Sequence, residues 1–248
     1  MFSESDAVVL RTIPYSDTSL ITRLFTKEWG KITVMAKGAR RKKNPLNSIL
    51  EPGSLINIQI IMKENRDIQI LKEASFNYIT MEIRNNLEKL LTTLSIVDIM
   101  DKTTRPMHAS PILFRLIYRV IHSLCYRNFE PNIIYWFYLI QLTIQHGFKP
   151  NIQSCSKCQN QMKNGILSKY NGELYCINCL NDKEIFLDLE SLNFLILLMK
   201  TNIDNLGELK TPKKYFNQIS FFLEQYMCHH IEGMSKVKSV NISHRLLN

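Results

Sequence analysis

The sequence predicts an α+β protein: a small five-stranded β-barrel at the N-terminus, followed by an all-helical domain that carries a metal-binding insert. Roughly the first 75 residues hold five short runs of β-branched and apolar residues. From about Tyr78, apolar residues recur at spacings of three and four, which is the helical period. Two Cys-x-x-Cys pairs then interrupt the helical region. We therefore predict a barrel domain at 1–78 and a helical domain at 79–248, with an insert at about 152–182.

Length and composition are those of an ordinary folded protein. The chain has 248 residues, of which 45% are hydrophobic and 21% charged, and this is enough to bury a sizeable core. No uninterrupted apolar run reaches the roughly 18 residues that a membrane span needs. Glu4 and Asp6 precede the first apolar stretch, which differs from the basic start of a signal peptide. We therefore expect a soluble, intracellular protein.

The charge balance narrows the choice of partners. Lys and Arg number 31 against 22 acidic residues, and the net charge of +9 attracts polyanions. Nucleic acid, an anionic membrane surface and an acidic protein all fit such a surface. A generally solvated basic surface is the alternative that net charge alone leaves open.

The strands of the barrel are predicted from short apolar runs separated by turn residues. These runs are 7–11, 20–25, 31–36, 55–60 and 68–71. In the fourth run Ile56, Ile58 and Ile60 alternate with other residues, so that they share one face. Closing five such strands into a barrel removes their exposed edges. Residues 38–45 form a polar loop between the third and fourth strands.

The helices are predicted from apolar periodicity and from capping signals. Residues 87–99 have the periodicity of one amphipathic helix. Ser110 and Pro111 supply an N-cap and a first-turn proline for the next helix. That helix is predicted to bury the stripe Ile112, Leu116, Ile117, Val120, Ile121 and Leu124. A central buried helix is predicted between Pro131 and Gly147. Two further helices are predicted to begin at Asp188 and at the pair Thr211-Pro212, the last burying a stripe of Tyr215, Phe216, Ile219, Phe222, Leu223, Tyr226 and Ile231.

Two cysteine pairs predict a metal site. Cys155 and Cys158 form one Cys-x-x-Cys pair, Cys176 and Cys179 form another, and 17 residues (159–175) separate them. This spacing is typical of a zinc ribbon. Four thiolates make a closed tetrahedral site, which suits one structural Zn²⁺ per chain and leaves no open position for catalysis. A hairpin of 166–167 with 173–175 is expected between the two pairs.

Other interpretations of the cysteines and histidines are weaker. Stable disulfides or a redox pair are the alternative for the paired cysteines, and an intracellular location argues against them. Cys125 and Cys228 lie outside the pattern, and we expect ordinary buried thiols. His229 and His230 are far from the cysteines in the sequence, and we do not expect them to bind metal.

Signatures of catalysis are absent from the sequence. It holds no phosphate-binding loop, no GxGxxG, no GxSxG and no HExxH motif. Asp98 and Asp101 lie three residues apart near a helix end, where capping or solvation explains them. A zinc-dependent nucleic-acid enzyme needs an open metal site or clustered carboxylates. We therefore predict a binding protein that is not an enzyme.

A basic segment provides the candidate nucleic-acid site. Between Arg23 and Lys43 the chain has eight basic residues and one acid, Glu28. Five of the cations are nearly contiguous on the loop after the third strand: Lys37, Arg40, Arg41, Lys42 and Lys43. Loops of a small five-stranded barrel of the oligonucleotide/oligosaccharide-binding (OB) type often dock single-stranded nucleic acid. We predict that these cations neutralise phosphates, a solvated loop being the alternative.

Nearby aromatic residues are candidates for contacts with bases. Tyr15, Phe25 and Trp29 lie in the same part of the sequence and each has a ring face on which a base can stack. Each is equally compatible with the barrel core. The sequence alone does not choose between these roles.

These segments resemble a known family. The segments AVVLRT (7–12), YSDTSL (15–20) with FT (25–26), GKI…AKGARR (30–41) and LEPGSL (50–55) are similar to the N-terminal part of the bacterial DNA repair protein family RecO. The cysteine pairs late in a helical domain and the ending HHIEG…KVKS (229–239) also resemble that family. The resemblance covers nearly the whole chain.

The resemblance implies a recombination mediator without nucleotide hydrolysis. It implies binding of single- and double-stranded DNA, annealing of complementary strands, and action with RecR to load RecA onto DNA coated by single-strand-binding protein. It also implies an OB fold, a zinc module and a location at the bacterial nucleoid in the cytoplasm. A zinc-ribbon adaptor that binds only proteins is the alternative, and it predicts no salt-dependent affinity for DNA.

The helix beginning at Pro111 offers a candidate partner surface. Polar residues spaced by three and four lie opposite its core stripe: Arg115, Arg119, His122 and Tyr126. The resemblance implies that the helical domain captures the acidic C-terminal tail of single-strand-binding protein. The guanidinium fork suits carboxylates, so we predict that Arg115 and Arg119 hold the tail and that Tyr126 lines its apolar notch. Solvation is the alternative, and Lys213 with Lys214 is the second choice of site.

Overall fold

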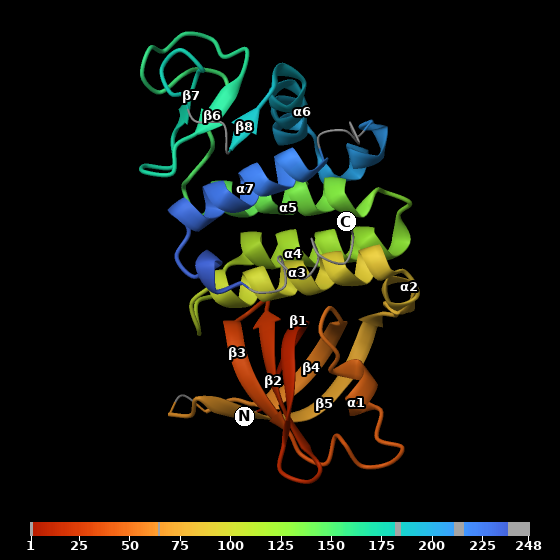
Figure 1. The fold of residues 1–248 in the computed structure, drawn as a ribbon. Coiled ribbons are helices and arrows are strands. Elements are labelled where there is room, and N and C mark those ends of the chain that lie inside the picture. Colours follow the sequence, from red (N-terminus) through yellow and green to blue (C-terminus); the bar gives the residue numbers. More distant parts are fainter. Residues whose placement is uncertain (1, 64, 182–184, 211–215, 238–248) are drawn as a thin grey trace. The chain divides into compact units, whose positions relative to one another are not determined.

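The computed structural model describes the chain except residues 1, 64, 182–184, 211–215 and 238–248. The chain is divided into two compact units (Figure 1). One spans Met1–Arg127 and takes in Lys236, and the other spans Asn128–Ser235. The predicted boundary at residue 78 marks the change from strand to helix, whereas the first compact unit also contains the helices that follow the barrel.

The N-terminal strands form a closed five-stranded barrel, as predicted. They are β1 (Phe2–Tyr15), β2 (Ser19–Thr26), β3 (Gly30–Ala36), β4 (Leu55–Ile61) and β5 (Ile68–Tyr78). Their order around the barrel is β1-β2-β3-β5-β4, with β3 and β5 parallel and the other pairs antiparallel. Strand β1 is long enough to pair with both β2 and β4, and a register shift between Val9 and Arg11 bends it. This strand therefore closes the sheet on itself.

The inside of the barrel is a continuous apolar core. Ile56, Ile58 and Ile60 are fully buried, which confirms the predicted alternation along β4. The short helix α1 (Leu46–Ile49) contributes Ile49 to the same core, and Leu50 follows it there. The barrel thus has its own hydrophobic core.

Three helices complete the first unit. They are α2 (Met81–Arg84), α3 (Leu87–Thr103) and α4 (Pro111–Tyr126). The Ser110 hydroxyl accepts a hydrogen bond from the Leu113 N–H at 3.3 Å, which confirms the predicted N-cap. The prediction was wrong for Ile112, which is exposed. It precedes Phe114, a residue of the buried face, by two positions and so points about 200° away from it.

Asp101 on α3 is neither a cap nor a solvated acid, and that expectation was wrong. Its side chain is 1% exposed, and one carboxylate oxygen lies 2.6 Å from Nη1 of Arg23 on β2. Lys31 on β3 donates to the backbone carbonyls of Asp101 and Thr104, each at 2.5 Å. Burial lowers the pKa of Lys31, opposed by the nearby Asp101 charge. A buried polar network therefore ties α3 to the barrel wall.

The second unit is built around α5 (Pro131–Gln145), the predicted central helix. Its Trp136 indole donates to the Ser220 hydroxyl at 2.8 Å, and its Tyr135 hydroxyl donates to the Glu224 carboxylate at 3.1 Å. Burial raises the pKa of Tyr135 well above its ordinary value. The helix ends before Gly147, as predicted, and Gly147 takes the left-handed conformation.

The remaining elements of this unit are α6 (Leu189–Lys200), the 3₁₀-helices η1 (Ile203–Glu208) and η3 (Met234–Lys236), and α7 (Phe216–His230). Asp188 caps α6 as predicted, accepting from the Ser191 N–H at 2.8 Å. The described part of the predicted stripe is buried, with Ile219, Phe222, Leu223 and Tyr226 in α7 and Ile231 directly after it. The predicted helix start at Thr211-Pro212 and Tyr215 lie outside the described residues, as does the side chain of Phe216.

A small sheet follows the first cysteine pair. Strands β6 (Gly165–Leu167) and β7 (Leu174–Tyr175) form the predicted hairpin, and β8 (Phe186–Leu187) adds a third strand that the sequence analysis missed. A two-residue strand is too short for any periodicity to reveal. Among the described residues, none of the helices is long and apolar enough to cross a membrane.

Candidate nucleic-acid interface and metal centre

The basic loop joins β3 to α1, and all five predicted cations on it are exposed: Lys37, Arg40, Arg41, Lys42 and Lys43. Ala39 lies within the same loop, is fully buried, and packs into the barrel core, so that it anchors the loop there. Gly38 and Lys43 take the left-handed conformation, which turns the chain sharply at both ends of the cationic stretch. The cations are therefore presented outward from an anchored backbone.

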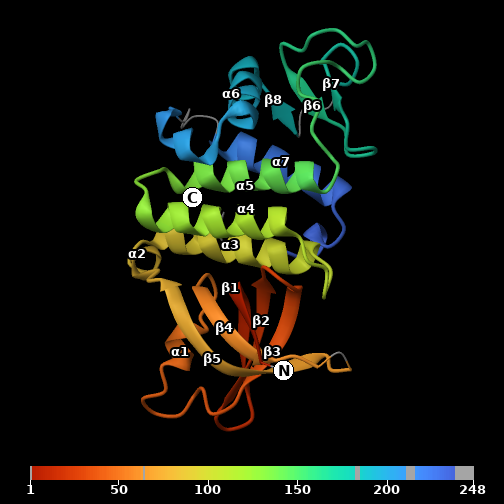
Figure 2. The ribbon, with the colours of Figure 1, turned by 180° about the vertical axis from the view of Figure 1, so that it is seen from behind.

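Hydrogen bonds hold this loop against the turn between β1 and β2. The Arg40 N–H donates to the Thr18 carbonyl at 2.8 Å, and the Arg40 guanidinium donates to the Ser16 carbonyl at 3.2 Å. Across the loop, the Asn44 amide donates to the Gly38 carbonyl at 2.9 Å. Figures 1 and 2 show the loop and the β1–β2 turn at the end of the barrel away from α3.

The charge of the loop is not neutralised by neighbouring acids. Within the described ranges, no carboxylate lies at ion-pair distance from Lys37, Arg41, Lys42 or Lys43. Such a cluster of exposed cations on a short fixed loop creates a positive potential that attracts phosphates. The arrangement suits binding of a polyanion.

The three candidate aromatic residues have different surroundings. Phe25 is 1% exposed in the barrel wall, so it does not offer a face to a base. Trp29 is half-buried against the barrel core. Tyr15 is 49% exposed at the end of β1, next to the Ser16 carbonyl that the basic loop contacts. Of the three, Tyr15 alone lies open beside the loop.

The four paired cysteines come together, as the spacing predicts. Their Sγ atoms all lie within 4.8 Å of one another, and Cys158 Sγ is 3.8 Å from Cys176 Sγ. In a tetrahedral zinc site with Zn–S bonds of about 2.3 Å, the sulfur atoms are about 3.8 Å apart. The cluster is therefore compatible with a zinc ion.

Backbone hydrogen bonds favour the thiolate form of one cysteine in the cluster. Burial of the Cys155 thiol raises its pKa, but N–H donors, led by that of Cys158, outweigh burial and lower the pKa to about 6. Hydrogen bonds with the other thiols, first with Cys176, raise the pKa of Cys179 to about 12. The backbone thus stabilises one thiolate, and four thiolates together need a bound cation to offset their repulsion. The donor set fits a soft divalent metal such as Zn²⁺.

The two histidines at the end of α7 contact the β6–β7 hairpin through backbone carbonyls. Nε2 of His229 lies 2.6 Å from the Lys169 carbonyl, and Nε2 of His230 lies 2.9 Å from the Gly172 carbonyl. Neither belongs to the cysteine cluster. They connect α7 to the hairpin between the two cysteine pairs. This structural role could not be predicted from the sequence, because each histidine and its partner lie far apart along the chain.

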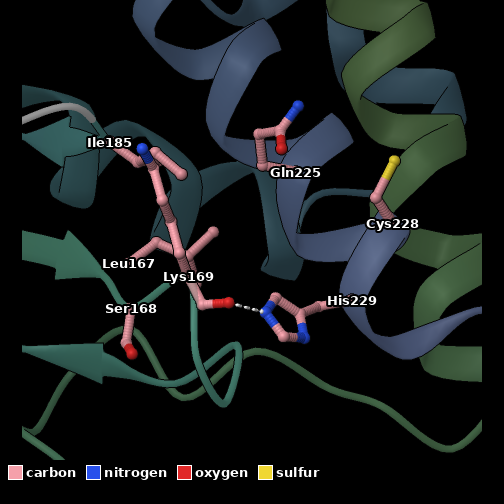
Figure 3. A pocket seen from close by; sticks show the side chains of 7 residues that line it. All are labelled: Leu167, Ser168, Lys169, Ile185, Gln225, Cys228 and His229. Carbon is pink, nitrogen blue, oxygen red and sulfur yellow. Dashed lines mark hydrogen bonds between the residues drawn. The ribbon is translucent and has the colours of Figure 1, made fainter. Parts of the chain in front are cut away.

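A cavity of about 360 Å³ lies between this hairpin and α7 (Figure 3). Its lining residues are Leu167, Ser168, Lys169, Ile185, Gln225, Cys228 and His229. The expectation of a buried thiol was correct for Cys125 and wrong for Cys228, which is exposed. Cys228 follows the buried Met227 and so points about 100° away from it around the helix.

The predicted partner residues lie on the outer side of α4. Arg115, Arg119 and Tyr126 are all exposed. The Tyr126 hydroxyl donates to the Ile79 carbonyl at 3.0 Å, and its ring centroid lies 4.8 Å from that of His122 and 5.8 Å from that of Tyr78. Burial, followed by the charge of Arg127, lowers the pKa of His122. Tyr78, whose ring joins this cluster from the end of β5, was not among the residues predicted from the sequence.

The strand order, the cationic loop and the four-cysteine cluster define an OB-fold protein with a helical region and a metal-binding-capable centre. The chain belongs to the recombination protein O (RecO) family. The family's N-terminal model, "Recombination protein O N terminal", matches residues 1–79, and its C-terminal model, "Recombination protein O C terminal", matches residues 84–239.

Curated relatives bear the same family name. A protein of Prosthecochloris aestuarii named "DNA repair protein RecO" is 25% identical over 98% of this chain and 97% of its own length. The protein of that name from Pelodictyon phaeoclathratiforme is 24% identical over 100% of this chain and 99% of its own. That of Salinibacter ruber is 32% identical over 68% of this chain and 65% of its own. The likeness therefore extends over both compact units.

Proposed function

We propose that this protein is a DNA-binding mediator of recombination in DNA repair. The observation that carries the proposal is the set of five exposed cations on one anchored loop of an OB-fold barrel: Lys37, Arg40, Arg41, Lys42 and Lys43. Membership of a family whose curated relatives are named as DNA repair proteins supports it. In this proposal the loop binds phosphates of single- and double-stranded DNA, because phosphate contacts need no base identity.

The mediator role extends the same site. A protein that binds strands through their phosphates brings complementary strands together without hydrolysing a nucleotide, and this accounts for annealing. We propose that it acts with RecR to load RecA onto DNA covered by single-strand-binding protein, in the cytoplasm at the nucleoid. Its chemistry is binding, and no group transfer is assigned to it.

The cysteine cluster has a structural part in this function. We propose that one Zn²⁺ per chain is held by Cys155, Cys158, Cys176 and Cys179, whose sulfur atoms all lie within 4.8 Å of one another. With all four positions taken by thiolates, the ion stabilises the small sheet and offers no open position for a substrate.

The outer side of α4 is the proposed contact with single-strand-binding protein. Arg115 and Arg119 supply cations for the carboxylates of its acidic C-terminal tail. The rings of Tyr126 and Tyr78 supply an apolar edge beside them, at a centroid distance of 5.8 Å. The second-choice residues, Lys213 and Lys214, lie outside the described part of the chain.

Salt-dependent DNA binding tests the proposed function. Replacing Lys37, Arg41, Lys42 and Lys43 by Gln should weaken binding of single-stranded and duplex oligonucleotides alike. Removing each cation that binds a phosphate should reduce the slope of log K against log salt by roughly 0.7 to 0.9. A matched variant that removes four cations elsewhere, Lys27, Lys72, Lys149 and Lys200, controls for net charge. Equal affinities and slopes in the loop variant and the wild type would contradict the proposal and favour an adaptor that binds only proteins.

A further inference from the structure

The outer face of the barrel carries a row of apolar side chains beside the basic loop. Ile13 pairs with Ile21, Ile21 with Met35, Met35 with Ile70, and Ile70 with Ile61. Residues directly opposite each other on neighbouring strands point to the same side of a sheet. These five residues, which we call the apolar row, therefore lie on the outer face of the barrel wall, one on each strand, and the row follows the curve of the closed barrel.

The row points outward, away from the barrel core. Its chain neighbours Leu20, Val34 and Leu71 are buried inside the barrel, and side chains alternate between the two faces along a strand. Ile13 is 43% exposed, and the other four residues of the row are half-buried. Tyr15 and Ile68 extend the exposed apolar surface along β1 and β5. Soluble proteins seldom expose a continuous apolar patch without a ligand or partner for it.

Cations border the row on both sides. Arg11 and Arg23 pair across β1 and β2, two residues from Ile13 and Ile21 on the side towards α3. Arg23 is held by Asp101, whereas the Arg11 side chain is exposed. On the other side the basic loop is fixed to the turn that follows Tyr15, through the Arg40 contacts to Ser16 and Thr18.

An apolar band between two lines of cations matches one kind of polymer. A single DNA strand presents anionic phosphates together with unpaired bases whose faces are free to stack. In a duplex the base faces are covered by their neighbours, so only the phosphates reach such a surface. The charge pattern and the apolar row together therefore favour single-stranded DNA as the occupant.

We propose that the apolar row and Tyr15 form a platform for unstacked bases, which makes this barrel bind single strands more tightly than duplex. The proposal rests on the proposed function, because the basic loop holds the phosphates of the same strand. The loop supplies affinity common to both forms of DNA, and the platform supplies the difference between them.

The test uses the full-length protein with Ile13→Thr and Tyr15→Thr together. Both side chains are exposed, and threonine keeps the β-branched shape that strands favour. A fluorescent oligothymidylate and a duplex of equal length are titrated at low and high salt. We expect the variant to bind the single strand about tenfold more weakly, with duplex affinity and both salt slopes unchanged. In the wild type, part of the single-strand affinity should persist at high salt.

A control and a second readout separate the possible failures. Leu197→Thr removes an exposed apolar side chain on α6 and should leave both affinities unchanged. An oligonucleotide with 5-iodouracil should photocrosslink to Tyr15 in the wild type. Equal weakening for single strand and duplex, no weakening at all, or crosslinks elsewhere would overturn the platform. If the loop variant alone binds DNA more weakly, the proposed function stands and only the platform fails.

Discussion

At the scale of single residues, Asp101 is the buried carboxylate through which α3 contacts two cations of the barrel wall. Its carboxylate is buried, with Arg23 at 2.6 Å and Lys31 Nζ at 3.8 Å. Removing one partner of a buried ion pair leaves the other charge without compensation, and this costs more than the pair itself contributes. The network therefore ought to be sensitive to the loss of this one carboxylate.

We predict that Asp101→Asn destabilises the protein by roughly 2–3 kcal/mol. This is below the value of about 3–5 kcal/mol for fully buried pairs, because the Arg23 side chain is 37% exposed and solvent screens it. Urea unfolding of the full-length protein measures the change. Glu51→Gln is the matched control, since its ion pair with Arg84 lies on the surface, and about 0–1 kcal/mol is expected there. Equal small effects of both substitutions would show that the buried network contributes no more to stability than a surface ion pair.

The role of Asp101 could not be predicted from the sequence, and the reason is distance along the chain. Its partner Arg23 is 78 residues away, so no local spacing marks the pair. The four cysteines, in contrast, come together as their spacing predicts, and the five cations lie on one exposed loop, because both patterns are local. The binding of zinc and of DNA by these groups stays a prediction. Phe25 illustrates the limit, since a ring in a strand looks the same whether it points inward or outward.

At the scale of elements, α4 has two faces of different composition. Its inner face buries Phe114, Ile117 and Leu124, and its outer face carries the arginines and Tyr126. The N-cap and the buried stripe of such a helix are predictable from period and capping. The aromatic cluster was not predictable, because Tyr78 joins it from the end of a strand. Long, periodic elements were therefore predicted well, and the two-residue strand β8 was missed.

We predict that Arg115→Ala with Arg119→Ala weakens binding of an acidic tail peptide of single-strand-binding protein by roughly tenfold or more. A charge-assisted hydrogen bond contributes about 1.5–3 kcal/mol, and two are removed. Fluorescence anisotropy with a labelled peptide measures the affinity. The control removes two cations outside α4, Lys72→Ala with Lys89→Ala, and should leave peptide binding intact. Unchanged peptide affinity in the arginine variant would place the tail site elsewhere on the chain.

At the scale of the whole molecule, the two candidate sites lie in different compact units. The barrel with α3 and α4 contains the cationic loop, and the second unit contains the cysteine cluster. The small sheet at the cluster has strands of only two and three residues. Such a sheet has little core of its own, so we expect a metal bound by the cluster to be needed for its order.

We predict that Cys176→Ser, or treatment with a chelator, lowers metal content and removes order from the small sheet while the barrel keeps its DNA affinity. Amide hydrogen exchange should show reduced protection in β6 and β7 and unchanged protection in β1–β5. Cys228→Ser changes a cysteine outside the cluster and should retain one zinc per chain. Full metal content in Cys176→Ser, or loss of protection spreading through the barrel strands, would contradict this prediction.

The long first strand has a consequence for the order in which the molecule is made. Phe2 on β1 pairs with Ile61 on β4, and β5 joins β4 to β3, so the barrel closes only after β5 has left the ribosome. Arg23 meets its carboxylate only after residue 101 has followed. Contacts between residues this far apart form slowly, and open strand edges are exposed to aggregation in the meantime. During synthesis, the nascent N-terminal half is therefore an open sheet in which Arg23 and Lys31 do not yet have Asp101 as a partner. We expect a chaperone to protect the chain from aggregation chiefly at this stage.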